Sequence, residues 1–153
     1  MKYLKTILRA YKYRIYPNKK QQELINKTIG CCRFVYNYYL NKKIELYKTE
    51  QKSIGYNACA NDLKNLKNQY EWLKEVDSIS LQQTLKDLDT AYQNFFRRIK
   101  NGEKEVGFPK FKSKKNPKQS YRTQNVNNNI EIKGNKIKLP KLGLVKFANS
   151  RSF

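Results

Sequence analysis

Histidine is absent from this sequence of 153 residues, and cysteine, acidic residues and long apolar runs are scarce. Without histidine, no Ser-His or Cys-His catalytic pair can form, and three cysteines cannot supply the roughly four nitrogen and sulfur ligands that zinc takes. Cys31, Cys32 and Cys59 include no Cys-x-x-Cys pair, which favours reduced core residues. We therefore expect no metal and no cofactor in this chain.

Long apolar runs are missing as well. No stretch approaches the ~18 apolar residues of a membrane-spanning helix. The first five residues carry charge but lack an apolar segment of signal-peptide length. We expect a soluble cytoplasmic protein with no membrane partner, associated with the nucleoid through the nucleic acid that it binds.

The scarcity of acids leaves a large excess of positive charge. The chain has 33 Lys and Arg against 12 Asp and Glu, a formal net charge of +21. Residues 1–20 hold seven basic groups and no acid, and residues 106–153 hold twelve basic groups and one acid, whereas the net charge of residues 21–105 is only +3. Self-repulsion on this scale indicates a polyanionic partner, and nucleic acid is the usual one. The uneven distribution predicts that the two chain ends form one anion-facing surface and the middle a separate module.

The order of side chains predicts a strand followed by a long helix. Residues 5–16 are rich in β-branched and aromatic side chains, which indicates a strand that Pro17 ends. Asn18 with Gln21 three positions later has the form of a capping box. Apolar residues then recur at helical spacing, so a helix is predicted over residues 19–47.

Two more helices are predicted after it. The second begins at Ser53, and the third is capped by Asp77 or Ser78 and ends at Asn101-Gly102. Gly30, inside the first helix, lowers helix propensity and suggests a close contact with another helix at that point.

The C-terminal third is predicted to form short strands. These are Tyr121–Gln124, Ile130–Ile132, Ile137–Leu139 and Leu144–Phe147, with Lys133-Gly134-Asn135 as a hairpin turn. If they pair with the N-terminal strand, the helices become an insertion in a small sheet or barrel. The predicted fold class is therefore α+β.

Residues 108–124 combine cations with aromatic side chains and contain no acid. Cations suit phosphates and exposed aromatic rings can stack on bases, so this segment is a candidate nucleic-acid contact. The alternative is a solvated basic loop, with Phe108 and Phe111 docked on the core. The candidate phosphate-binding residues are Lys110, Lys112, Lys114, Lys115, Lys118 and Arg122.

An amide-rich run, Gln124–Asn129, follows directly. Asn and Gln can bind adenine through two hydrogen bonds, but they are also ordinary loop residues, and both interpretations stay open. The tyrosines near the first two helices, including Tyr36, Tyr39 and Tyr47, are expected to pack in the core or in an interface, with their hydroxyls reaching water.

The carboxylates do not suggest a catalytic centre. Asp87 and Asp89 are two residues apart on a predicted helix, so they point in nearly opposite directions. Glu71, Glu75 and Asp77 are close in sequence and are expected, with that pair, to lie on solvated helix faces. We expect no enzymatic activity from this chain alone.

Taken in order, the motifs resemble TnpB-type proteins, also called OrfB, of bacterial insertion sequences. The resemblance covers nearly the whole chain. Its motifs are Tyr13–Asn18 with Gln22–Ile25, Arg33–Asn37, Trp72–Asp77, Leu81–Gln83, Ala91–Phe96, Gly107–Phe111, Ser120–Gln124 and Lys138–Gly143.

The resemblance implies the N-terminal half of an RNA-guided DNA endonuclease. In this family a wedge β-barrel carries an inserted helical recognition domain. Here that implies a wedge-like domain over residues 1–17 and 104–153, incomplete at its C-terminus, and a three-helix recognition domain over residues 18–103. The family cuts with a downstream RuvC-like domain that uses three carboxylates and divalent metal beside a zinc-binding element, and nothing in this sequence matches those parts.

The resemblance also implies partners and binding residues. Guide RNA derived from the transposon end would lie along the basic wedge face, which adds Lys138 to the RNA-binding candidates. Double-stranded DNA would be recognised at a short target-adjacent motif by a monomer. The DNA-motif residues would be Tyr56, Ser78, Gln82, Asn125 and Asn127, with Ser78 at a position where relatives often carry lysine. The alternatives are a nuclease-less DNA-binding regulator and a non-functional truncated remnant.

Overall fold

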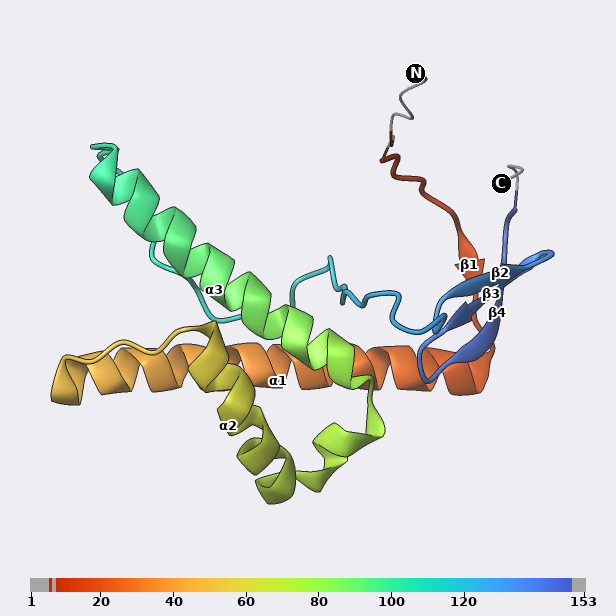
Figure 1. Ribbon diagram of the computed structural model, residues 1–153, viewed down its shortest axis with the longest axis horizontal. Helices are drawn as coiled ribbons and strands as arrows, with labels where there is room; N and C mark the ends of the chain where they lie inside the picture. Colours follow the sequence, from red (N-terminus) through yellow and green to blue (C-terminus); the bar gives the residue numbers. More distant parts are fainter. Residues whose placement is uncertain (1–5, 7, 150–153) are drawn as a thin grey trace, which may run out of the picture.

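The computed structural model describes residue 6 and residues 8–149 of the chain. Along the chain, the helices follow one strand near the N-terminus and precede three strands near the C-terminus. In space the four strands lie together at the N-terminal end of α1 (Figure 1). The elements are β1 Ile15–Tyr16, α1 Lys19–Glu50, α2 Tyr56–Gln69, the 3-10 helix η1 Glu71–Glu75, α3 Ser78–Lys100, β2 Glu131–Lys133, β3 Lys136–Leu139 and β4 Gly143–Phe147. The predicted α+β class with three helices is confirmed. No helix in the described part of the chain is long and apolar enough to cross a membrane.

Two of the three helices begin where the sequence predicts, and α1 continues to Glu50, three residues beyond its predicted end. At the start of α1, the side chain of Asn18 accepts a hydrogen bond from the backbone N–H of Gln21 at 2.8 Å, and the Gln21 side chain accepts one from the Asn18 N–H at 2.9 Å. Asp77 caps α3 by accepting from the Ile79 N–H at 3.2 Å. Gly102, just beyond α3, has a φ of 79°, the left-handed conformation that glycine adopts readily.

The second helix begins three residues later than predicted, at Tyr56 with Gly55 as its N-cap. The reason lies in α1, where the ammonium of the buried Lys43 donates to the carbonyl of Ile54 at 2.8 Å. The same ammonium lies 4.7 Å from the centre of the Tyr92 ring on α3. This contact holds residues 51–55 in a linker between α1 and α2.

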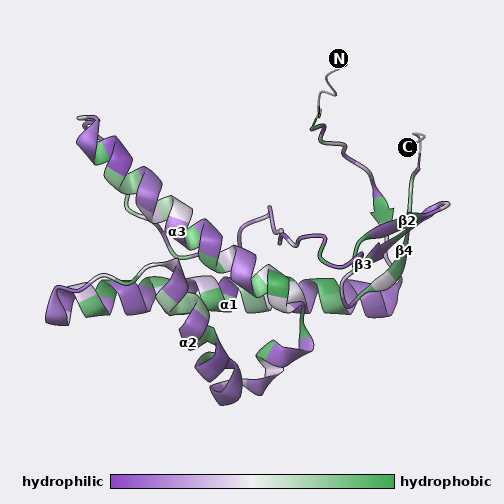
Figure 2. Cartoon of the chain, in the orientation of Figure 1, coloured by the Kyte–Doolittle hydropathy of each residue, from purple (hydrophilic) through white to green (hydrophobic). Residues whose placement is uncertain are grey.

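The core lies where α1, α2, η1 and α3 meet (Figure 1). Figure 2 shows hydrophobic residues on α1 and α3 where the two helices cross, and mostly hydrophilic residues toward their free ends. Burying each large apolar side chain contributes about 1.5–3 kcal/mol. The buried cluster consists of Cys31, Cys32, Val35, Tyr36, Tyr39, Leu40, Cys59, Leu63, Leu66, Leu73, Val76, Leu81, Leu85 and Leu88.

The two ends of the chain pair in one antiparallel sheet of order β1-β4-β3-β2. Ile15 lies opposite Phe147, which confirms the predicted pairing of the chain ends. The predicted hairpin is also confirmed, because β2 and β3 flank Gly134-Asn135. The sheet is attached to the start of α1, where the Gln21 amide donates to the carbonyls of Leu142 at 3.2 Å and Leu144 at 2.8 Å.

One predicted strand is shorter than expected, and another does not form. Of the strand predicted over residues 5–16, only Ile15–Tyr16 pairs with β4, while Lys5 and Ile7 lie outside the described residues. Tyr121–Gln124 forms no strand, because the Tyr121 ring packs against the helical core and Thr123 donates to Asp77. Among the described residues the sheet is open, with β1 and β2 as its edges, so the predicted barrel is not confirmed.

Replacing Gly30 by alanine is expected to stabilise the protein by about 0.5–1 kcal/mol, because alanine has the higher helix propensity. The suggested close helix contact is wrong: a Cβ at Gly30 would meet the Arg33 guanidinium at 3.7 Å, an ordinary contact. Urea unfolding of Gly30→Ala measures the change. Gly134→Ala is the control, and it should destabilise because Gly134 has a φ of 62°. A loss of stability in Gly30→Ala would contradict the prediction.

The free energy of unfolding is expected to fall between about pH 9 and pH 11. Burial raises the pKa of the Cys32 thiol from 9.0 to about 11, and burial also raises the pKa values of Cys31 and Cys59. Above the unfolded pKa, the unfolded chain ionises while the folded chain stays protonated, so stability is lost as pH rises through this window. Urea titrations across the window should show a smaller dependence on pH for Cys32→Ala than for wild type. Identical dependence would contradict this assignment.

Candidate nucleic-acid interface

The sheet has one apolar face and one basic face, because side chains along a strand alternate between its two sides. Val145 and Phe147 are buried, and Phe147 meets the Tyr13 ring edge-on at 5.5 Å. An apolar hollow of about 300 Å³ separates this face from Ile25 and Ile29 of α1. The intervening residues of β3 and β4 therefore point away from the helices.

A row of three lysines crosses the other face. Lys146 of β4 lies opposite Lys136 of β3, which lies opposite Lys133 of β2, and Tyr16 of β1 extends the row beyond Lys146. Directly opposed residues lie roughly 5 Å apart, and like charges at that spacing destabilise a sheet. Glu131 approaches Lys133 at 4.0 Å at one end of the row. Binding of a polyanion at this face would offset the repulsion between the lysines.

Lys138, predicted to bind RNA, lies on this face between Glu131 and Leu144. Sequence reasoning missed Lys133, Lys136 and Lys146. The signal that could have found them is the alternation of lysine with apolar residues in β3 and β4, which places every lysine of a half-buried strand on one side.

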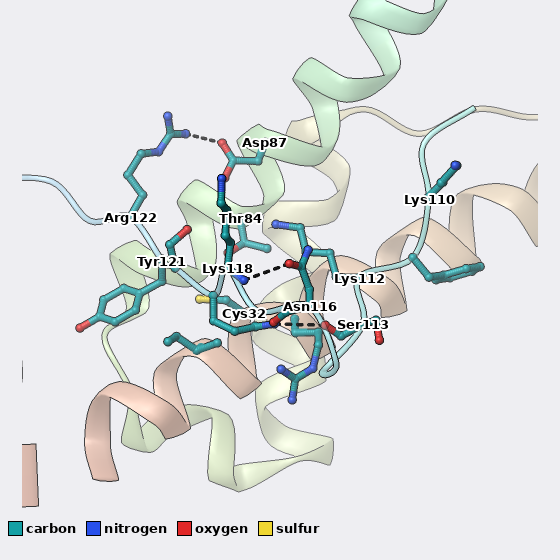
Figure 3. A pocket seen from close by; sticks show the side chains of 15 residues that line it. Cys32, Thr84, Asp87, Lys110, Lys112, Ser113, Asn116, Lys118, Tyr121 and Arg122 are labelled. Atoms are coloured by element: carbon teal, nitrogen blue, oxygen red, sulfur yellow. Dashed lines mark hydrogen bonds and ion pairs between the residues drawn. The ribbon is translucent and has the colours of Figure 1, made fainter. Parts of the chain in front are cut away.

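A second basic surface is a groove of about 640 Å³ between α1, α3 and the segment after α3 (Figure 3). Lys110, Lys112, Lys118 and Arg122 line it, so four of the seven predicted phosphate-binding residues gather here. Lys114 and Lys115 are exposed in the turn between Ser113 and Asn116, beside this lining rather than in it, and Lys138 lies on the sheet.

Some aromatic residues of this segment dock on the core, and one is exposed for stacking on a base. Phe108 packs edge-on against Tyr92 at 5.4 Å and Phe95 at 5.2 Å, although 43% of its surface remains exposed. Phe111 lines the groove and is 53% exposed, so its ring is accessible for stacking. Tyr121 is half-buried against the core.

Asp87 supplies the one carboxylate among the described residues that line the groove, and it faces Arg122 (Figure 3). Arg122 Nη2 donates to Asp87 Oδ1 at 2.5 Å. Both side chains are about half exposed, so the pair contributes at most about 1 kcal/mol to stability. Asp87 lies on a solvated helix face, as expected, and it also holds a cation of the groove.

Two of the predicted DNA-motif residues lie on one side of α3, and a third, Tyr56, contacts a lysine on the same side. Ser78 and Gln82 are exposed, and with Lys86 they follow at steps of four residues along one side of the helix. The Lys86 ammonium lies 5.6 Å from the centre of the Tyr56 ring at the start of α2. Sequence reasoning missed Lys86, although its helical spacing from Ser78 and Gln82 would have indicated it.

The amide-rich run is tied to the start of α3. Thr123 Oγ1 donates to Asp77 Oδ2 at 2.5 Å, and Ser80 Oγ donates to the same oxygen at 2.6 Å. Asp77 is buried, so its expected place on a solvated face is wrong. These bonds bring the residues before Asn125 to the same end of α3 as Ser78.

Within this run the asparagines build a turn. Asn125 Oδ1 accepts from the Ile130 N–H at 3.2 Å, and Asn129 Oδ1 accepts from the Val126 N–H at 2.7 Å. Asn127 is exposed and has a φ of 53°, a left-handed conformation that asparagine tolerates well. The amide oxygen of Asn125 thus stabilises the turn, as in an ordinary loop. Base contact by Asn125 and Asn127 stays a prediction.

The described residues contain no group of three or more Cys, Asp or Glu side chains that could hold a metal ion. Asp77 binds two hydroxyls, Asp87 faces Arg122, and Asp62 accepts from Tyr39 and Lys42. The resemblance implies divalent metal and zinc only for a downstream domain, and no chemical step is assigned to either in this chain.

Comparison with known proteins finds related sequences over most of the chain. Residues 1–52 match the model of a helix-turn-helix domain of OrfB proteins of the IS605 type. InsQ of Escherichia coli (strain K12), named as a candidate RNA-guided DNA endonuclease, is 38% identical over 147 residues, which are 94% of this chain and 34% of InsQ. A protein of Streptomyces pristinaespiralis with the same kind of name is 35% identical over 119 residues, 76% of this chain and 28% of that protein.

The virulence protein VsdF of Salmonella dublin differs from these two in length. It is 38% identical over 120 residues, and the match covers 71% of this chain and 95% of VsdF. The chain thus spans about a third of the length of the two endonuclease relatives and nearly all of the short one. In the described part of residues 1–52, β1 is followed by the single unbroken helix α1, so this region does not fold as two helices joined by a turn.

Asp87→Asn is expected to tighten binding of a single-stranded polynucleotide by about three- to tenfold at low salt. The substitution removes the one negative charge among the described lining residues and releases Arg122 for phosphate. Fluorescence anisotropy with a labelled oligonucleotide measures the effect. Asp89→Asn, two residues away on α3, is the matched control for the loss of one carboxylate. Weaker binding by Asp87→Asn would mean that Asp87 holds Arg122 in the productive position instead.

Proposed function

Because this chain belongs to the TnpB/OrfB family of bacterial insertion sequences, we propose that it is the nucleic-acid-binding portion of a transposon-encoded RNA-guided DNA endonuclease. The observation that carries the proposal is the row formed by Lys146, Lys136 and Lys133 across the sheet. Like charges in register destabilise the free protein, and their repulsion is offset when a polyanion binds.

In this proposal the chain has two parts. Residues 1–17 and 104–153 form the wedge-like domain, and residues 18–103 form the recognition domain inserted in it. The pairing of Ile15 with Phe147 supports this division, because it joins residues from before and after the inserted helices in one sheet. The open edges β1 and β2 are where further strands of a barrel would pair.

Guide RNA is the proposed ligand of the two basic surfaces. Lys138 and the lysine row would contact its backbone on the sheet, and Lys110, Lys112, Lys118 and Arg122 would do so in the groove. Phe111, exposed in the groove, offers a ring on which an unpaired base can stack. Lys114 and Lys115 extend the positive charge along the turn beside the groove.

A short target-adjacent DNA motif is the proposed ligand of the exposed side of α3. Ser78 and Gln82 carry hydroxyl and amide groups of the kind that read base edges. Tyr56 and Lys86 lie further along that side, and Asn125 and Asn127 belong to the turn anchored at the start of α3. Their amides would complete the DNA contact.

The chain is proposed to act as a monomer on its nucleic acid, in the cytoplasm and at the nucleoid, and not to cleave DNA alone. Cleavage by the whole family protein would need carboxylates and metal ions from another part of the polypeptide.

A second candidate function is DNA binding without guided cleavage, as a regulator. The observation that favours it is VsdF, a relative of which this chain covers 95% and which therefore has a comparable length. A non-functional remnant is the third possibility.

Sequencing of the RNA that copurifies with the whole chain separates these functions. A guide-binding protein should enrich one RNA from the transposon end over total cellular RNA. Recovery of no specific RNA, together with salt-sensitive binding to any duplex, would overturn the guided function and favour the regulator. An aggregated protein that binds neither nucleic acid would indicate the remnant.

Replacing two lysines of the row, Lys136→Gln with Lys146→Gln, is expected to stabilise the protein while weakening RNA binding. Loss of the repulsion should raise the free energy of unfolding by about 0.2–1 kcal/mol. The slope of log K against log salt should shrink by about 1.4, because two phosphate contacts to single-stranded RNA are lost. Urea unfolding and anisotropy titrations from low to high salt measure the two effects.

The matched control removes the same charge elsewhere, with Lys48→Gln and Lys64→Gln on α1 and α2. Both residues are exposed, and Lys48 belongs to the last turn of α1. The C-terminal end of α1 and the helix α2 both lie away from the sheet in Figure 1. The control should leave most of the salt slope unchanged. Equal loss of slope in both double variants would contradict a specific role for the row.

A further inference from the structure

The basic segment beyond α3 has no regular secondary structure, and its internal hydrogen bonds join Ser113, Asn116 and Gln119 to one another rather than to the helices. Residues 103–130 form no helix or strand, and residues 110–120 are all exposed. Phe108 rests on α3 before these residues, and Tyr121 enters the core after them. A chain of this kind is mobile unless other contacts restrain its middle.

One residue of α1 binds the middle of this segment twice. The Asn37 side-chain oxygen accepts a hydrogen bond from the backbone N–H of Lys112 at 2.7 Å. The Asn37 side-chain nitrogen donates to the backbone carbonyl of Lys112 at 2.9 Å. The amide thus pairs with both polar groups of one residue, much as a neighbouring strand would.

The geometry points to Asn37 as a positioning residue that fixes the basic segment against α1 and so shapes the groove, an inference that rests on the proposed RNA-binding function. Asn37 carries no charge and acts through the backbone of Lys112. Its two bonds fix the direction of the chain, and the Lys112 ammonium then lies 4.6 Å from the centre of the Tyr36 ring. Lys110 and Lys118, on either side, are thereby held on the same groove.

The energetic consequence follows from the cost of ordering a chain on binding. A segment that is already fixed presents its cations to phosphate without further loss of conformational freedom, whereas a free segment must be ordered each time RNA binds. Asn37 should therefore contribute to RNA affinity although it contacts no RNA.

The test compares Asn37→Leu, which keeps the size and removes both bonds, with Asn41→Leu, one turn further along α1 and exposed. Hydrogen exchange of the Lys112 amide should accelerate in Asn37→Leu and stay unchanged in Asn41→Leu, with no change in the α1–α3 core in either variant. RNA affinity should fall about tenfold in Asn37→Leu alone, because ordering the segment becomes part of binding.

Salt dependence separates positioning from simple loss of stability. Lys112→Gln removes one cation and should lower the slope of log K against log salt by about 0.7. Asn37→Leu removes no cation, so it should lower the affinity at every salt concentration while the slope keeps its wild-type value, because the same lysines reach phosphate once the segment is ordered. A slope lowered as much as in Lys112→Gln, or unchanged exchange of the Lys112 amide, would overturn the inference.

The outcomes for Asn37 and for the proposed function remain distinguishable. If wild type binds no RNA in a salt-dependent way, the proposed function fails, and the exchange experiment still decides whether Asn37 holds the segment. If wild type binds RNA and Asn37→Leu binds equally well, the positioning role fails while the proposed function stands.

Discussion

The packing of α1 against α3 is the interaction on which the rest of the structure depends. Val35, Tyr39 and Leu40 of α1 are fully buried, as are Leu81 and Leu88 of α3. Because α1 is a single helix of 32 residues, whatever it touches is placed relative to this core. Its N-terminus holds the sheet, its middle holds the basic segment after α3, and its C-terminal half holds the linker to α2. Both basic surfaces are therefore positioned by one rigid element.

Acidic residues are scarce, and three aspartates of the helical part each join separate segments of the chain. Asp77 caps α3 and accepts a hydrogen bond from Thr123, and Asp87 accepts one from Arg122. Asp62 accepts hydrogen bonds from Tyr39 and Lys42. For Asp62, burial acts to raise the pKa, but the hydrogen bonds from Lys42 and Tyr39 outweigh it and lower the pKa. The acids thus hold elements together and leave the lysines of the sheet and groove for a polyanion. A net charge of +21 destabilises the free fold through self-repulsion, and bound anions would offset this repulsion.

Local signals were sufficient for much of the fold and for part of the site. The Asn18 capping box, the cap of α3 at Asp77 and the Gly134-Asn135 hairpin each lie within a few residues of sequence, and each prediction is confirmed. Tyr121–Gln124 was predicted wrongly because its β-like composition cannot reveal that the Tyr121 ring and the Thr123 hydroxyl are used by the helices. Asp77 was placed on a solvated face, and Arg122 was not foreseen as the partner of Asp87, because Thr123 and Arg122 are 46 and 35 residues away from these two aspartates.

The sequence by itself determined the helices, the hairpin, the uneven charge and the family, since these depend on residue type and short-range spacing. Only the tertiary structure decided which cations share a surface. Cross-strand register aligned Lys146, Lys136 and Lys133, and the crossing of α1 with α3 brought Asn37 within hydrogen-bonding distance of Lys112, 75 residues later. The physical reason is that a hydrogen bond or a charge interaction depends on distance in space, and chain folding makes that distance independent of separation in sequence.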